Sequence, residues 1–230
     1  MLGLYFSEGA AILSRFPLSS LPRASHKGGG HQGADLVAIH VPVESNGFLR
    51  ILVANCHLCH HPYGPYVFRC ENRSFAEAME SDRKTQLPVL QRVLGELHKH
   101  AHAGDGHQHP CILCGDFNAA SHLDYAEDAV AWPTSLACEE AKFVDTYALA
   151  NPGHLGSWKQ RRYDAPGITW SCLPEEEKAG VFDRIDFIYV DEGCLVQVIR
   201  SNTIDSTTPG CDPWPSDHRA VFSEICLKVC

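Results

Sequence analysis

Residues 111–118 read Cys111-Ile112-Leu113-Cys114-Gly115-Asp116-Phe117-Asn118, a short apolar run followed by a glycine, an acid and an amide. The apolar run predicts a buried strand, and Gly115 allows the chain to leave it through a tight turn. In an extended chain, positions i and i+2 face the same way, so Asp116 and Asn118 should enter one site while Phe117 points into the core. A carboxylate beside a carboxamide suits a hard cation and a phosphate oxygen. The alternative is an Asp/Asn turn that only satisfies its own backbone.

Two later motifs supply possible partners for this one. Arg184-Ile185-Asp186 lies in the apolar run 182–190, which predicts a second strand, and Ser216-Asp217-His218 opens a third strand over residues 215–222. In this order, the three motifs resemble those of the endonuclease/exonuclease/phosphatase superfamily, the deoxyribonuclease-I-like phosphoesterases. The resemblance extends from about Glu8 to the end of the chain. It implies an α/β fold, a four-layer α/β/β/α sandwich of two mixed sheets.

The resemblance also implies a role for each residue of a phosphoesterase site. His218 would lie beside the scissile phosphate, and Asp186 would fix its tautomer and favour its charged form. Asp116 would orient or activate the attacking water, and Asn118 would bond a phosphate oxygen. Asp217, Asp116 and Asn118 would hold the metal. We expect Mg2+, with Mn2+ as a substitute, because oxygen ligands and a phosphate suit a small hard cation.

Three further segments match the same pattern. Residues 54–58 resemble an Asn-x-His-Leu motif, which implies that Asn55 binds substrate and that His57 contacts the phosphate or assists the leaving group. Glu8 stands where members of the superfamily place a glutamate that pairs with a catalytic histidine. In Gly-Ile-Thr-Trp, at residues 167–170, Thr169 would bond a phosphate oxygen and Trp170 would lie in the core.

One departure from the pattern concerns the start of the chain. The superfamily begins with strands that carry an Asn and then a Gln-Glu motif, whose glutamate is the principal metal ligand, and only seven residues precede Glu8. We therefore expect a domain that lacks the N-terminal strands. Two functional hypotheses follow: a metal-dependent phosphoesterase that hydrolyses a phosphodiester or phosphomonoester by in-line water attack, or a catalytically inactive truncated member that acts as a binding fragment. The substrate class stays open among nucleic acid, phospholipid headgroups and small phosphodiesters.

Length and composition narrow the class of protein. A chain of 230 residues with 44% hydrophobic residues is sized for one domain, residues 1–230. No apolar run reaches membrane-spanning length. The net charge is −9 with histidines neutral, and the Lys and Arg residues are scattered. This argues against a protein that grips duplex nucleic acid through many phosphates, although a bound metal can supply local positive charge.

Cysteines are numerous, and two pairs have the spacing of a zinc knuckle. The pairs are Cys56/Cys59 and Cys111/Cys114, among eleven cysteines in all. Both pairs fall in or at the end of predicted strands, where positions i and i+3 point to opposite faces. Burial of small apolar thiols is therefore favoured over a zinc-binding module. Unpaired thiols indicate a reduced, intracellular protein, and we expect a cytoplasmic location.

The remaining pattern predicts the elements around the site. Residues 8–17 predict a strand ended by Pro17. Residues 35–43 and 48–58 predict a hairpin because Asn46-Gly47 lies between two apolar runs. Residues 62–74 predict a loop that walls the cleft. Residues 75–101 have apolar side chains at helical spacing, with a kink or a late start at Pro88.

Five charged residues near these motifs have other expected roles. Arg184 is predicted to be an ion-pairing residue that positions carboxylates, and Asp183 a surface acid. Lys159, Arg161 and Arg162 form a basic cluster. This cluster either touches substrate phosphate or belongs to a solvated loop, and the sequence favours neither.

Overall fold

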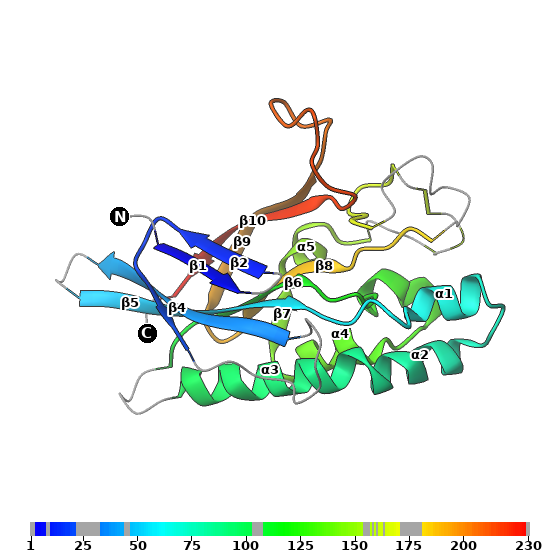
Figure 1. Cartoon of the computed structure of the whole chain (residues 1–230), viewed down its shortest axis with the longest axis horizontal. Helices are drawn as coiled ribbons and strands as arrows, with labels where there is room; N and C mark the ends of the chain where they lie inside the picture. The colour runs from blue at the N-terminus through cyan, green and yellow to red at the C-terminus, as the bar shows by residue number, and fades with distance from the viewer. Residues whose placement is uncertain are drawn as a thin grey trace.

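The computed structural model describes residues 3–7, 10–21, 33–43, 47–102, 108–153, 157, 159, 161–162, 164–170 and 181–228. Its ten strands and the order in which they pair define the architecture (Figure 1). The strands are β1 (Gly3–Ser7), β2 (Ala10–Ser14), β3 (Leu18–Ser20), β4 (Gly33–Val43), β5 (Gly47–His57), β6 (Cys111–Asp116), β7 (Phe143–Asp145), β8 (Asp186–Asp191), β9 (Leu195–Ile204) and β10 (Ala220–Leu227).

A six-stranded mixed sheet forms the centre of the molecule, in the order β3-β4-β5-β6-β8-β7. Only β5 and β6 are parallel; the other neighbours are antiparallel. Strands β9 and β10 form a second, antiparallel pair, and β1 and β2 a third. The predicted hairpin is confirmed, with Val43 paired to Gly47 and Gly33 to His57.

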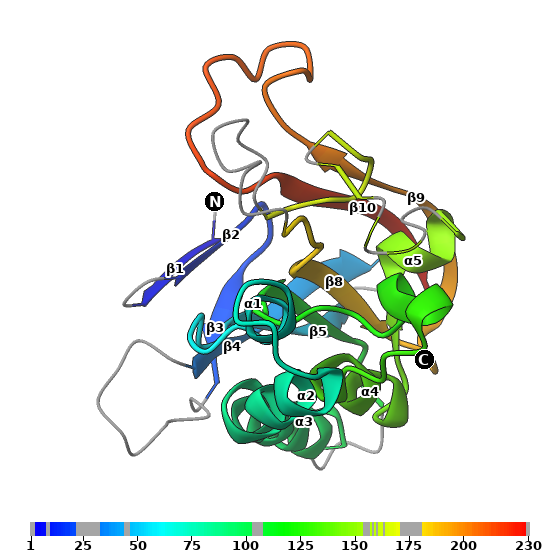
Figure 2. The same cartoon turned by 90° about the vertical axis from the view of Figure 1, so that its right-hand side faces the viewer.

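Helices cover one face of the six-stranded sheet, and the β9–β10 pair lies on the other side (Figure 2). The predicted α/β sandwich is therefore confirmed. None of the helices in the described part combines the length and hydrophobicity that crossing a bilayer requires. The helices are α1 (Gly64–Arg69), α2 (Phe75–Lys84), α3 (Gln86–Ala101), the 3-10 helix η1 (Leu123–Asp128), α4 (Pro133–Glu140) and α5 (Thr146–Ala150).

Alternation along β4 builds a core on each face of this sheet. Leu36 and Ala38 face the helical side, where they join a cluster with Leu90 and Val93 of α3. Val37 lies on the opposite face and packs in a cluster with Ile12 of β2. A strand with apolar residues on both faces must be covered on both, which explains the layered arrangement.

Two helical predictions changed in the structure. The helix expected over residues 75–101 is divided at Thr85, so Pro88 falls in the first turn of α3, where its missing N–H costs no helical bond. The predicted loop over residues 62–74 is wrong in part, because α1 occupies its centre. Pro65 stands at the start of that helix, a position where proline favours helix initiation.

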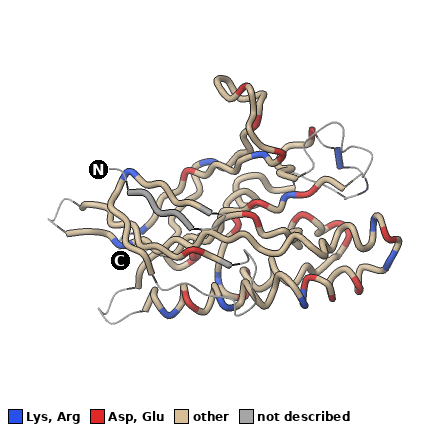
Figure 3. Tube along the Cα trace, in the orientation of Figure 1, with Lys and Arg blue, Asp and Glu red and all other residues tan. Residues whose placement is uncertain are grey.

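Lys and Arg lie interspersed with Asp and Glu along the described part of the trace (Figure 3). This distribution agrees with the scattered basic residues of the sequence.

Candidate active site

Three neighbouring strands place the candidate residues in one row. Strands β5 and β6 are parallel, and His57 is paired with Asp116 at their carboxyl ends. Strand β8 runs antiparallel to β6 and pairs Asp186 with Asp116. Residues distant in sequence therefore meet at one end of the central strands, where the strand ends leave room for a ligand.

His218 reaches this row from the segment just before β10. Its Nδ1 lies 2.9 Å from Oδ2 of Asp186. Potential ligand atoms of Asp116, Asp186 and His218 all lie within 4.8 Å of one another. The structure thus brings together three residues that the sequence analysis placed in the site, and His57 lies beside them with Nε2 3.7 Å from Oδ2 of Asp116.

Burial and mutual repulsion control the charges in this cluster. Burial, with the nearby charge of Asp186, raises the pKa of Asp116 to about 7, although hydrogen bonds from Asn118 oppose the shift. Burial alone would lower the pKa of His218. The hydrogen bond and charge of Asp186 outweigh it and raise that pKa above its usual value. The pKa of His57 is lowered, first by burial and then by the charge of His218.

Gly115 and Asn118 give the chain its shape at the end of β6. Gly115 has φ of +124°, and a Cβ there would lie 2.0 Å from the carbonyl oxygen of Cys56. Only glycine therefore fits, as the sequence predicted. Asn118 donates from Nδ2 to Oδ2 of Asp116 and to the carbonyl of Leu58, each at 3.0 Å. Its side chain holds the Asp116 carboxylate in place.

A cleft of about 260 Å³ opens over the cluster. Aromatic side chains form part of its wall: the ring of Trp170 lies 4.7 Å from the ring of His218, and its Nε1 donates to the Tyr66 hydroxyl at 3.2 Å. Trp170 is partly buried and packs against the core cluster of Tyr63, Val181 and Ile185, as expected, and it also lines the cleft. The cleft is lined by His57, His60, Tyr63, Tyr66, Asp116, Asn118, Trp170, Ile185, Asp217 and His218.

Asp183 is not a surface acid, contrary to the prediction. It is 0% exposed. Its carboxylate accepts hydrogen bonds from the hydroxyls of Tyr63 and Tyr125, both at 2.8 Å. Arg161 pairs with it at 2.6 Å and is itself buried, so that arginine neither faces solvent nor is free to bind phosphate. The sequence missed this cluster because its members are up to 120 residues apart.

Arg184 is the ion-pairing residue that the sequence predicted. Its side chain is fully buried. Nη2 lies 2.8 Å from Asp124, and Nη1 lies 2.7 Å from Asp145. One guanidinium thus neutralises two buried carboxylates two residues before Asp186.

Three other predicted site residues can be placed in the structure. Thr169 is 0% exposed, and its Oγ1 accepts the backbone N–H groups of residues 185 and 186 at 3.0 and 3.2 Å. It positions Asp186 and does not reach the cleft, which corrects the expected phosphate contact. Asn55 donates from Nδ2 to the carbonyl of Ala11 in β2 at 3.3 Å. Asp217 is exposed and lines the cleft but lies outside the three-residue cluster. Glu8 falls outside the described residues.

The cysteine pairs do not form a metal site in the described part of the chain. Cys56, Cys59, Cys111 and Cys114 are free thiols. Burial raises the pKa of Cys111 to about 12 and that of Cys114 to about 11, which disfavours the thiolate that zinc requires.

The acidic cluster fits a divalent cation. Atoms of two carboxylates and an imidazole lie within 4.8 Å of one another, close enough for one ion to bridge them. Burial and the charge of Asp186 raise the pKa of Asp116, and a bound cation would relieve that repulsion. Oxygen donors of this kind suit Mg2+, and the nearby imidazole is also compatible with Mn2+.

Comparison with known proteins gave one family and several relatives. The model of the Endonuclease/Exonuclease/phosphatase family matches residues 5–218. The uncharacterized protein F14F9.5 of Caenorhabditis elegans is 29% identical over an alignment of 145 residues. The match covers 50% of this chain and 40% of that protein. The chain thus matches less than half the length of this relative.

Three solved structures share the fold. Truncated TDP2 of Caenorhabditis elegans has a TM-score of 0.53 at 16% identity, over 96% of this chain and 73% of that one. The catalytic domain of Xenopus laevis APE2 has a TM-score of 0.51 at 16% identity, over 85% and 55%. The catalytic domain of human Nocturnin, with a bound sulfate anion, has a TM-score of 0.51 at 15% identity, over 95% and 63%.

Proposed function

This chain belongs to the endonuclease/exonuclease/phosphatase family, and from that premise we propose that it is a metal-dependent phosphoesterase. It would hydrolyse a phosphodiester or phosphomonoester bond by in-line attack of water. The observation that carries the proposal is the pair of His218 and Asp186, 2.9 Å apart, beside the buried carboxylate of Asp116.

His218 acts next to the phosphoryl group. Its pKa is raised because Asp186 stabilises the imidazolium, so it can present an N–H to a phosphoryl oxygen and stabilise the charge that develops there. Asp186 accepts a hydrogen bond from Nδ1–H, and in the imidazolium form that its charge favours, Nε2 also carries a proton to donate toward the cleft. Packing of the ring against Trp170 limits its rotation.

Asp116 and Asn118 act on the water and the phosphate. Asp116 would hold the metal and orient the attacking water beside it, and its pKa, about 7 with no cation bound, would fall once a cation neutralises the repulsion from Asp186. Asn118 keeps this carboxylate oriented through its Nδ2. His57, whose pKa is lowered, is neutral at neutral pH and assists the leaving oxygen from the β5 side of the cleft.

The carboxylates of Asp116 and Asp186 would hold the metal, with Asn118 next to them and Asp217 adding negative charge at the rim. A bound Mg2+ or Mn2+ would neutralise charge on the phosphoryl oxygens. The size of the cleft, about 260 Å³, favours recognition of one phosphoryl group and its immediate neighbours, whether in a nucleic acid, a phospholipid headgroup or a small phosphodiester.

Hydrolysis of bis(p-nitrophenyl) phosphate and of p-nitrophenyl phosphate, with Mg2+ or Mn2+ and with EDTA, tests the proposal. His218→Ala and Asp116→Ala should each lower kcat by about a hundredfold or more, and EDTA should abolish turnover. His102→Ala and Asp164→Asn are matched controls, because both side chains are exposed and lie outside the cleft; they should retain activity. An inert wild-type chain, or full activity in both site variants, would contradict the proposal.

A further inference from the structure

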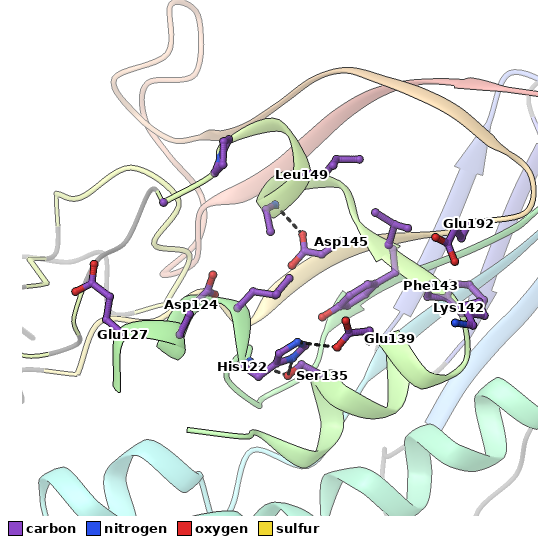
Figure 4. A pocket seen from close by; sticks show the side chains of 17 residues that line it. His122, Asp124, Glu127, Ser135, Glu139, Lys142, Phe143, Asp145, Leu149 and Glu192 are labelled. Carbon is purple, nitrogen blue, oxygen red and sulfur yellow. Dashed lines mark hydrogen bonds and ion pairs between the residues drawn. The ribbon is translucent and has the colours of Figure 1, made fainter. Parts of the chain in front are cut away.

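A second cavity, of about 520 Å³, lies apart from the active-site cleft (Figure 4). Residues of η1, α4, β7 and α5 form it, and it shares no lining residue with the cleft. Its volume is in the range of small-molecule binding pockets, roughly 300–1,000 Å³. The proposed reaction does not use it.

Apolar side chains at this cavity are exposed to solvent. Leu123 of η1 is 45% exposed and Leu149 of α5 is 54% exposed, and both line the cavity together with Phe143. Large apolar side chains that gather around one concavity gain free energy when an apolar ligand covers them. These walls therefore suit a ligand with an apolar body.

A polar group lies on the α4 side of the cavity. His122 Nδ1 is 2.9 Å from Ser135 Oγ, and its Nε2 is 3.0 Å from Glu139 Oε2. Figure 4 shows these three side chains next to one another, with Leu149 across the cavity. Burial lowers the pKa of His122, and the attraction of Glu139 opposes that shift.

Tyr189 supplies an observation that points to a ligand. It lines the cavity, and only 3% of its surface is exposed. Among the described residues, nothing hydrogen-bonds its hydroxyl. A buried hydroxyl without a partner is unfavourable. Its oxygen has almost no accessible surface, so a polar group of a bound molecule would satisfy it after a small shift of the surrounding side chains.

The charge of the lining selects the sign of that ligand. Arg184, which does not line the cavity, pairs with Asp124 and Asp145. Lys142 is the one Lys or Arg among the lining residues. Three carboxylates are not engaged by Arg184, so the cavity favours a cation and repels an anionic phosphoester. The five acids of the lining are Asp124, Glu127, Glu139, Asp145 and Glu192.

We propose that this cavity is a second binding site, for a small amphiphilic ammonium compound. Its apolar body lies against Leu123, Phe143 and Leu149. Its ammonium group lies near Glu139, and a polar atom of the ligand bonds the Tyr189 hydroxyl. The site does not depend on the proposed phosphoesterase activity.

Calorimetric titration with three indoles of matched shape tests the proposal: tryptamine is a cation, tryptophol is neutral and indole-3-acetate is an anion. Tryptamine should bind with a Kd between about 0.1 and 1 mM, the range for a ligand of this size. Tryptophol should bind more weakly, and indole-3-acetate should not bind measurably. Equal affinity for all three, or no saturable binding of tryptamine up to about 10 mM, would overturn the proposal.

Two variants place the binding in this cavity. Glu139→Gln should weaken tryptamine binding roughly two- to fivefold, the range for an exposed ion pair. Glu140→Gln is the matched control, since Glu140 is exposed on the same helix but does not line the cavity; it should bind as the wild type does. Leu149→Trp should fill the opening and reduce binding at least tenfold. Unchanged binding in Glu139→Gln and Leu149→Trp would place tryptamine elsewhere and refute the site.

Discussion

Replacing Arg184 by methionine should cost the protein a large part of its stability. Methionine has a similar length, so it fills the space of the arginine without its charge. The change leaves the carboxylates of Asp124 and Asp145 buried, each 4% exposed, without the guanidinium that now lies 2.8 and 2.7 Å from them. An uncompensated buried charge is far less favourable than a missing surface ion pair.

The structure allows the magnitude to be compared with an internal control. Breaking a buried ion pair by removing one partner costs about 3–5 kcal/mol. Arg200 also forms an ion pair, with Glu224 at 2.7 Å, but its side chain is 61% exposed, so Arg200→Met should cost about 0–1 kcal/mol. The difference, about 2–5 kcal/mol, corresponds in a chain of this length to a melting temperature lower by roughly 4–20 °C for the Arg184 variant.

Urea unfolding followed by circular dichroism gives the free energy of unfolding of both variants and the wild type. Arg184→Lys keeps the charge but loses the forked geometry, so its stability should lie between those of the wild type and Arg184→Met. If Arg184→Met costs no more than Arg200→Met, the buried network does not stabilise the fold, and the interpretation of Arg184 as a structural residue is refuted.

Three further predictions concern Gly115 near the end of β6, the buried acid Asp82 and the metal. Gly115→Ala should destabilise the protein by more than about 2 kcal/mol, because φ of +124° is strained for alanine and its Cβ would overlap the Cys56 carbonyl; urea unfolding measures this, and a neutral effect would show that the turn adapts. Asp82 accepts from Thr134 N at 3.0 Å, and burial raises its pKa to about 6, so the stability it contributes is present below about pH 4 and is lost as the pH rises through about 6. Asp82→Asn should remove that slope, and a variant with the wild-type pH profile would contradict the assignment. Addition of Mg2+ or Mn2+ should raise the melting temperature of the wild type but not of Asp116→Ala, whereas an equal rise in both would place the ion elsewhere.

Local patterns were sufficient to predict much of the sheet. The Asn46-Gly47 pattern predicted that β4 and β5 are neighbours, and alternation leaves one register that buries both strands. The convergence of Asp116, Asp186 and His218 followed from the resemblance, and the pairing of β6 with β8 explains it physically. Period-two alternation says which side chains share a face, but it does not say which strands are neighbours.

Asp183 shows why other residues were misplaced. In the sequence it is a charged residue at the start of a strand, which ordinarily lies at the surface. In the structure it is buried because Tyr63, Tyr125 and Arg161 surround its carboxylate, and each comes from a different segment.

These long-range contacts explain how one short segment positions Asp186, the acid of the proposed active site. Asp183 is held by tyrosine hydroxyls and Arg161, Arg184 is held by two carboxylates, and Ile185 is 2% exposed in the core. The N–H groups of residues 185 and 186 both donate to Thr169 Oγ1, and the Ile185 carbonyl accepts from Phe117 N at 2.8 Å. These contacts hold the backbone of residues 183–186 in place and so orient the Asp186 side chain toward His218. A catalytic group held in this way loses little entropy when it acts, so the buried charges two and three residues away are part of how the site is built.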